Sequence, residues 1–107
     1  MRIAWIGGLD RNQGELQRLA AQRGHLLDFH TGNTHGRGAS ELRAIVERAN
    51  FVIILTDVNS HGGVLLAKRT SSKAGKGALV MRKCGRARFV QLLEALDIRH
   101  GRLRVAS

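Results

Sequence analysis

The feature that most constrains the fold is an uninterrupted apolar run, Phe51–Leu55, in the middle of the chain. Its β-branched and aromatic residues favour a strand, and because apolar and polar residues do not alternate, both faces of this strand are expected to be covered. Strands of that kind belong to parallel sheets, which carry helices on both sides. The sequence therefore predicts an α/β fold.

Shorter apolar runs and segments of helical spacing alternate along the rest of the chain. Strands are predicted at residues 3–6, 26–29, 51–55 and 78–81, and helices at 11–23, 40–49, 60–74 and 86–96. Asp10 with Gln13 predicts a capping box, Ser40 predicts the next cap, and Gly24 and Gly75 predict two helix ends. This order predicts a single three-layer Rossmann-like domain. Its sheet is expected to have four to five strands, mainly parallel, in the order 2-1-3-4.

A chain of 107 residues is expected to form one domain, residues 1–107, since two cores could not each bury enough apolar surface. Leu103 and Val105 leave two interpretations open for residues 97–107, an edge strand or a tail. No run approaches the roughly 20 apolar residues of a membrane span, and the N-terminus lacks the apolar stretch of a signal peptide. With Cys84 as its one cysteine, the protein is expected to be cytoplasmic.

Positive charge is concentrated in the second half of the chain. Through Leu65, seven Arg and six acidic residues give a net charge of +1. From Leu66 onward, eleven Lys and Arg and two acidic residues give +9. This asymmetry indicates an anionic partner for one side of the molecule, and a solvated basic surface that aids solubility explains it equally well.

Polar residues that follow the predicted strands are expected to meet at one edge of the sheet. In the order 2-1-3-4, successive connections change direction between the first and third strands. Ligands of open parallel sheets bind at such a switch point, off the carboxyl ends of the strands. The residues expected there are Gly7, Gly8, His30, Thr31, Asp57, Asn59, Ser60, His61, Gly62, Arg82, Lys83 and Cys84.

Several familiar chemistries are disfavoured by this set of residues. The Gly7-Gly8 turn lets a ligand approach the backbone, and the helix behind it offers N–H groups to an anion. However, the chain has neither the dinucleotide pattern G-x-G-x-x-G nor the Walker pattern, and no acid follows the second strand to bind a ribose. Asp57 is placed like the phosphorylated aspartate of response-regulator receivers, but Gly7-Gly8 replace their magnesium-binding acids. A structural Asp57 that binds amides in its own turn is equally well supported.

His61 is the strongest candidate for a functional side chain. It stands at the predicted start of a helix, which favours the neutral imidazole. Such an imidazole suits ligation of a metal or haem iron, or general-base catalysis, and the alternative is a structural histidine that hydrogen-bonds Asp57. The other histidines have no comparable setting. Cys84 is expected to be a small buried residue rather than a thiolate between Lys83 and Arg86.

The basic second half makes nucleic acid the natural rival partner. Aromatic residues are scarce, since Trp5, Phe29, Phe51 and Phe89 all fall on predicted strands or on a helix face, and the chain has no tyrosine. A base-stacking platform is therefore not expected. Binding to the phosphate backbone without sequence preference remains open.

Taken together, these motifs resemble a bacterial family called domain of unknown function 2325. The resemblance spans residues 2–97 and rests on the Gly-Gly turn, the pattern T-D-x-x-x-H that ends in His61, the helix with Lys68, Gly75-Lys76 and the strand that ends at Arg82. Gly62-Gly63 and the glycine-rich loop before residue 39 depart from the family's pattern.

The resemblance implies a Rossmann-like domain. It also implies haem binding, with His61 as the axial ligand and Arg82, Lys83 and Arg86 against the propionates. Because haem is large for a domain of this size, a dimer that encloses it between two copies would follow.

The sequence therefore supports two functions of different classes. The first is a non-enzymatic module that binds haem or another anionic cofactor at the switch point, with a nucleotide as an alternative ligand. The second is a basic accessory protein that binds nucleic-acid backbone through its C-terminal helix and tail. An enzyme is disfavoured because no acid–base pair or activated nucleophile is evident. The cofactor-binding residues expected for the first function are Gly7, Gly8, Asp57, Asn59, Ser60, His61, Gly62, Arg82, Lys83 and Arg86.

Overall fold

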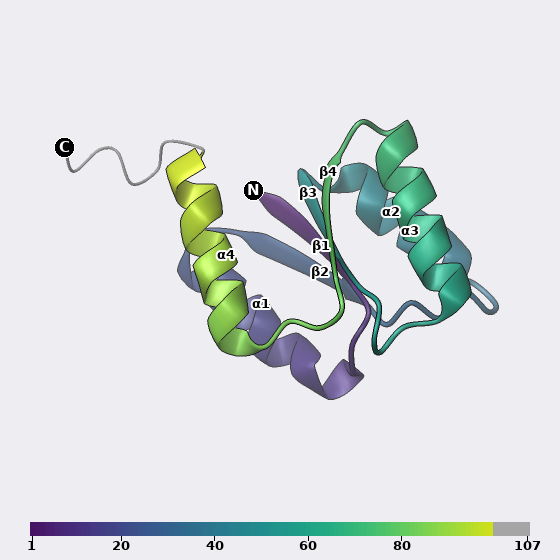
Figure 1. Ribbon diagram of the computed structural model, residues 1–107, viewed down its shortest axis with the longest axis horizontal. Coiled ribbons are helices and arrows are strands. Elements are labelled where there is room, and N and C mark those ends of the chain that lie inside the picture. Colours follow the sequence, from purple (N-terminus) through teal and green to yellow (C-terminus); the bar gives the residue numbers. More distant parts are fainter. Residues whose placement is uncertain (100–107) are drawn as a thin grey trace.

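A parallel sheet forms the centre of the computed structural model, which describes residues 1–99 (Figure 1). Its four strands are all parallel and lie in the order β2-β1-β3-β4. The predicted fold class and strand order are therefore confirmed. The strands are β1 (Arg2–Ile6), β2 (Leu26–His30), β3 (Phe51–Leu55) and β4 (Gly77–Met81).

Helices cover both faces of the sheet (Figure 1). Because side chains alternate along a strand, the central strands β1 and β3 each contribute to two apolar cores. Trp5 and Ile53 pack with α1 (Gln13–Gln22) and α4 (Arg86–Arg99) on one face. Ile6 and Ile54 pack on the other face with α2 (Gly38–Arg48) and α3 (His61–Lys73). The central strands β1 and β3 are therefore almost fully buried, as the apolar run predicted.

Two helix starts differ from the prediction. The prediction of a capping box formed by Asp10 and Gln13 is wrong. A 3-10 turn, η1 (Asp10–Asn12), leads directly into α1, and no side chain caps either helix. The cap at Ser40 is also wrong, since α2 begins two residues earlier at Gly38. There, the His30 ring lies 2.9 Å from the Gly38 carbonyl oxygen, a tertiary contact that fixes the start of this helix. Capping patterns carry no information about such contacts.

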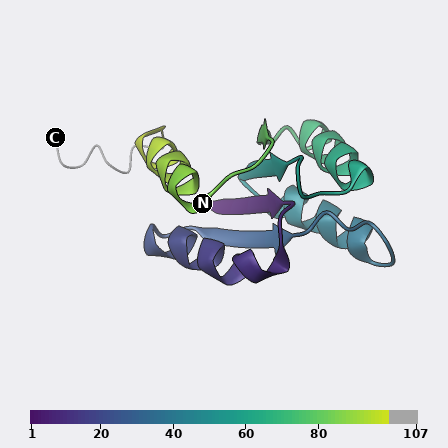
Figure 2. The same cartoon turned by 60° about the horizontal axis from the view of Figure 1, so that its bottom comes forward.

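The connections place the carboxyl ends of all four strands at one edge of the sheet, as Figure 2 shows from a second direction. The chain leaves β1 towards β2 through α1 on one face, and it leaves β3 towards β4 through α3 on the other face. The switch point therefore lies between β1 and β3, where it was predicted. The candidate edge strand with Leu103 and Val105 lies outside the described residues. Within residues 1–99, no helix has the length and apolar character needed to cross a membrane.

Candidate functional site at the carboxyl edge of the sheet

The Gly7-Gly8 turn after β1 uses its backbone amides within the protein. Both glycines have positive φ, +112° and +96°, which side-chain-bearing residues rarely adopt. The Gly7 N–H donates to the His30 carbonyl at 2.7 Å, and the Gly8 N–H donates to the Val58 carbonyl at 2.6 Å. The first hydrogen bond joins the end of β1 to the end of β2, and the second joins it to the loop after β3. Neither amide is therefore free to bind an anion.

The Asn59 side chain links the two strands at the switch point by hydrogen bonds. Its amide group donates to the Leu55 carbonyl at 2.7 Å and to the Ile6 carbonyl at 3.4 Å, so it joins the ends of β3 and β1. Its carboxamide oxygen is buried without a hydrogen-bond partner in the described part of the chain. That oxygen faces the backbones of Gly32 and Gly63, where an added Cβ would collide with it. The Asn59 amide is thus occupied structurally, although sequence reasoning placed it among the ligand-binding residues.

Ser60 and His61 form the start of α3. The Ser60 hydroxyl accepts a hydrogen bond from the Gly63 N–H at 2.9 Å and donates one to the Gly32 carbonyl at 2.7 Å. It therefore caps α3 and ties it to the loop after β2. The His61 side chain is exposed, and its ring makes no hydrogen bond or ion pair within residues 1–99. The alternative in which His61 is held by Asp57 is not what the structure has, so the imidazole is accessible.

Basic side chains stand at the end of β4, next to this loop. Arg82 reaches the Asp57 carboxylate at 3.5 Å, and 87% of the Arg82 side chain remains exposed. An ion pair so long and so exposed stabilises the fold very little. Lys83 is also exposed. Both cations therefore stay available to an anionic ligand at this edge.

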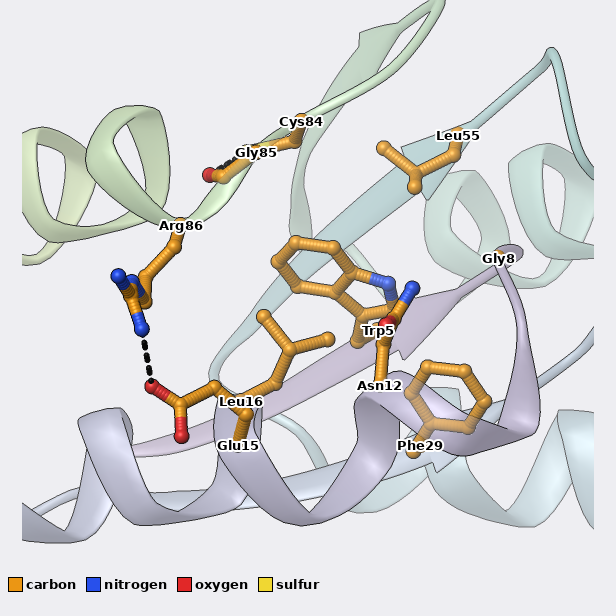
Figure 3. Close-up of a pocket in the computed structure, with 10 residues that line it drawn as sticks. All are labelled: Trp5, Gly8, Asn12, Glu15, Leu16, Phe29, Leu55, Cys84, Gly85 and Arg86. Atoms are coloured by element: carbon orange, nitrogen blue, oxygen red, sulfur yellow. Dashed lines mark hydrogen bonds and ion pairs between the residues drawn. The ribbon is translucent and has the colours of Figure 1, made fainter.

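The clearest cavity at the carboxyl edge lies between α1 and α4 and has a volume of about 220 Å³ (Figure 3). Its wall is largely apolar. In Figure 3 the Glu15 carboxylate of α1 and the Arg86 guanidinium of α4 face each other beside the cavity. The distance from Arg86 Nη1 to Glu15 Oε1 is 3.2 Å. The lining residues are Trp5, Gly8, Asn12, Glu15, Leu16, Phe29, Leu55, Cys84, Gly85 and Arg86.

Two titratable groups of this cavity are shifted in opposite directions. Hydrogen bonds from Arg18, and next from Arg86, hold the pKa of the Glu15 carboxyl below its ordinary range. Burial raises the pKa of the Cys84 thiol, and the nearby charge of Arg88 offsets this only in part. Cys84 is therefore a protonated thiol at neutral pH, as expected, but it is half-buried rather than buried.

A second, shallower hollow of about 390 Å³ lies directly over the switch point. It brings together three of the predicted site residues, Gly8, Asn59 and Ser60, with Thr31. Neither hollow is lined by His61, Gly62, Arg82 or Lys83. The predicted site residues therefore share one edge but divide into a cavity, a hollow and an exposed rim, which consists of Asp57, His61, Arg82 and Lys83.

Two histidines to which the sequence assigned no functional role organise the fold. His30 is buried; its Nδ1 accepts the Gly32 N–H at 2.9 Å, so its Nε2 donates to the Gly38 carbonyl. His25 is also buried, with Nε2 2.8 Å from the Asp97 carboxylate of α4 and Nδ1 2.8 Å from the amino group of Met1. No spacing pattern could have indicated His25, because its partner lies 72 residues away.

The described residues offer limited ligation for a metal or for haem. They contain no group of three or more His, Cys, Asp and Glu side chains arranged to hold a metal ion. Haem iron needs only one or two axial ligands, and the free imidazole of His61 meets that requirement. The cavity beside α1 is smaller than the roughly 300–1,000 Å³ of common cofactor pockets. A haem on His61 would therefore lie over the rim, where a further surface would have to cover it.

Fold and site together define a small Rossmann-like domain with a polar rim at its switch point. Residues 2–96 match the model of a family described as "Uncharacterized protein conserved in bacteria (DUF2325)". The chain belongs to this family, which confirms the resemblance drawn from its motifs. Comparison with curated proteins and with solved structures found no match.

Proposed function

We propose that this protein is a non-enzymatic module that binds an anionic cofactor at the carboxyl edge of its sheet, and that the cofactor is haem with His61 as axial ligand. The observation that carries the proposal is the accessible imidazole of His61, which has no hydrogen-bonding partner in residues 1–99. A histidine already engaged in the fold, as His30 is, would have to break two hydrogen bonds before it could ligate iron.

Charge at the rim supports an anionic ligand. Arg82 and Lys83 are exposed at the end of β4, on the same edge of the sheet as His61, and Asp57 holds Arg82 only weakly. Two carboxylates, such as haem propionates, would gain charge-assisted hydrogen bonds from these side chains. Arg86 contributes only if it leaves Glu15, to which it is bonded at 3.2 Å. We therefore expect Arg82 and Lys83 to matter more than Arg86.

The exposure of the rim also bears on stoichiometry. A haem lying on an open surface would leave much of its apolar macrocycle in water, which is unfavourable at about 25 cal/mol per Å². A second copy of the chain would bury the uncovered face, and a two-fold arrangement would let both copies contribute equivalent residues. We therefore propose a homodimer as the haem-bound form.

The test is a titration of the purified protein with hemin, followed by its visible absorption spectrum. We expect a Soret band that saturates at a fixed stoichiometry in the native protein and that shifts or disappears in His61→Ala. His35→Ala is the matched control, because His35 is likewise exposed but lies in the loop before α2. A spectrum indifferent to His61→Ala, or equally altered by His35→Ala, would contradict the proposal and favour a nucleotide or nucleic acid.

A specific observation keeps nucleic-acid backbone as a second candidate. A cleft of about 380 Å³ between α2 and α3 is lined by three cations, Arg43, Arg69 and Lys73, and by one acid, Glu47. None of the three cations forms an ion pair within residues 1–99. Phosphate contacts of this kind weaken steeply as salt rises, whereas axial ligation of haem does not. The surface lies on the face of the sheet opposite α4, so it differs from the C-terminal helix expected from the charge distribution.

A further inference from the structure

Strand β4 is an edge of the sheet that lacks the usual protection. Its sequence, Gly77–Met81, contains no charged residue and no proline, and Ala78 and Val80 are exposed. Along its outer side it pairs with no strand of the described chain. Natural proteins shield such edges with charges, bulges or covering segments, because the free N–H and C=O groups invite another strand.

The opposite edge of the same sheet shows the contrast. Strand β2 carries Asp28 at its centre, and this carboxylate is bonded to Arg2 at 2.8 Å and to Arg48 at 3.0 Å. A charge in the middle of an edge strand discourages further pairing. One edge strand of the sheet therefore carries a charge that disfavours pairing, and the other edge strand, β4, does not. This difference suggests that β4 pairs with a strand of another molecule.

A right-handed connection through α4 would not place a parallel strand on the outer side of β4. Helix α4 lies on the same face as α1, and a right-handed connection on that face moves in the direction from β1 to β2. From β4, that direction leads back to β3 and not outward. A strand placed outside β4 through α4 would need a left-handed crossover, which occurs in only about 2% of such connections.

Beside β4 runs an apolar groove that would accept side chains of an added strand. The groove lies between β4 and α4 and has a volume of about 360 Å³. It occurs on the α1 and α4 face of the sheet, where every second side chain of an added strand would point. Its lining residues are Phe51, Gly77, Ala78, Leu79, Leu92, Ala95 and Leu96.

The surroundings of β4 on the opposite face are basic. Lys76 precedes the strand, Arg82 follows it, and Lys73 ends the neighbouring helix α3. If a second copy paired antiparallel about Leu79, Lys76 of each copy would face Arg82 of the other, and like charges opposite each other destabilise a strand pair. An acidic partner is therefore favoured over a second copy.

We infer that β4 is a docking edge for an extended acidic segment of another protein, which adds to the sheet as a strand. Alternate side chains of this segment are apolar and fill the groove beside α4, while the intervening ones are acidic and face Lys76 and Arg82. Main-chain hydrogen bonds to β4 supply affinity, and the alternation of apolar and acidic residues supplies specificity. The groove and Lys76 lie outside the ligand site proposed at the rim, whereas Arg82 belongs to both surfaces.

The probe for the test is a short peptide with blocked ends that alternates glutamate with valine. Binding is followed by titration and by hydrogen exchange of the β4 amides. We expect exchange across Gly77–Met81 to slow at least about tenfold at saturation, because a paired edge loses its contact with water. A lysine–valine peptide, and a peptide of the same composition with its glutamates and valines in separate blocks, should give no such protection.

Substitutions then separate strand addition from attraction by net charge. Lys76→Glu is expected to weaken binding of the glutamate–valine peptide about threefold to thirtyfold, the effect of exchanging an opposite-charge pair for a like-charge pair. Arg37→Glu, at the start of α2, changes the net charge equally and should have a smaller effect. Ala95→Glu places a charge on the exposed wall of the groove and should also weaken binding.

Three results would overturn the inference. Peptide binding without slower exchange in β4 would mean that no strand is added. Equal losses from Lys76→Glu and Arg37→Glu would mean a non-specific attraction of charge. Protection of β4 that rises with protein concentration in the absence of peptide, together with sedimentation at the mass of a dimer, would assign this edge to a second copy of the chain.

Discussion

Gly62 and Gly63 are adjacent in α3, yet they have different physical roles. At Gly62 an added Cβ would meet only the Thr34 hydroxyl, at an ordinary contact distance of 3.5 Å. At Gly63 an added Cβ would collide with the Gly32 carbonyl oxygen and would lie 2.6 Å from the carboxamide oxygen of Asn59. Close approach of two backbones, rather than flexibility, therefore requires the glycine at position 63.

Alanine substitution at these two positions should give effects of opposite sign. Gly62→Ala should raise the free energy of unfolding by about 0.4–1 kcal/mol, since it restricts the unfolded chain at a position where Ala fits. Gly63→Ala should lower it by about 1–3 kcal/mol or more, because the loop after β2 must move. Urea unfolding of both variants checks this pair of values. Equal effects would show that the contact between Gly63 and Gly32 has no structural weight.

Residue chemistry was predictable from the sequence where it depended on neighbours along the chain. His61 was singled out because it begins a helix after a strand, and it does lie exposed at the carboxyl edge. The link formed by Asn59 and the bond between His25 and Asp97 depend on strand ends and helices that meet only after folding. No local pattern encodes those distances, so the sequence could indicate which edge carries the site but not which side chains are already engaged.

Among the elements, α4 packs on the sheet through one row of buried side chains. Phe89 and Leu93 are fully buried, and the Phe89 ring lies edge-on to Trp5 with the ring centres 5.0 Å apart. On the β4 side, α4 leaves the apolar groove with Leu92 half-buried. The side of the helix that carries Phe89 and Leu93 is therefore packed against the sheet, whereas the side that faces β4 is partly open to water.

Truncation of the anchor should be far more costly than truncation of the open side. Phe89→Ala should lower the free energy of unfolding by about 3–5 kcal/mol, the usual range for a buried phenylalanine. Leu92→Ala should cost less than half as much, because part of that side chain is already in water. Circular dichroism during urea unfolding gives both values. Similar losses would mean that the groove is closed in solution.

The strands were predicted to within one residue at each end, whereas the starts of α1 and α2 were each missed by two residues. A continuous apolar run such as that of β3 indicates burial on both faces directly, so its position follows from composition. The starts of α1 and α2 are set by a 3-10 turn and by a contact with His30, which compete with local capping preferences. Element boundaries depend on tertiary contacts more than element identity does.

At the scale of the whole molecule, the excess of positive charge makes each carboxylate important. Asp28 is the clearest case, because it bonds Arg2 of β1 and Arg48 of α2. Burial raises the pKa of the Asp28 carboxyl, but the hydrogen bonds and charges of Arg2 and Arg48 outweigh this, so the pKa lies below its ordinary range. The folded state therefore binds a proton at Asp28 less readily than the unfolded chain does.

It follows that Asp28 stabilises the fold at neutral pH and that this stabilisation is lost on acidification. The contribution is complete above the ordinary aspartate range, near pH 4, and disappears as pH falls through the lower pKa of the folded state. Asp28→Asn should unfold more easily at pH 7 and show a shallower loss of stability below about pH 5. Glu47→Gln, an exposed acid of α2, is the control. An unchanged pH profile in Asp28→Asn would contradict this assignment.

The position of Trp5 gives the molecule an internal optical reporter. It is the one tryptophan of the chain, its indole N–H donates to the Gly7 carbonyl at 3.0 Å, and its ring forms part of the cavity wall at the carboxyl edge. Haem on the rim would absorb the light that indole emits and dim its fluorescence. A small apolar occupant of the cavity would instead replace water beside the ring and move the emission wavelength. The fluorescence of one residue thus distinguishes an occupied rim from an occupied cavity in unlabelled protein.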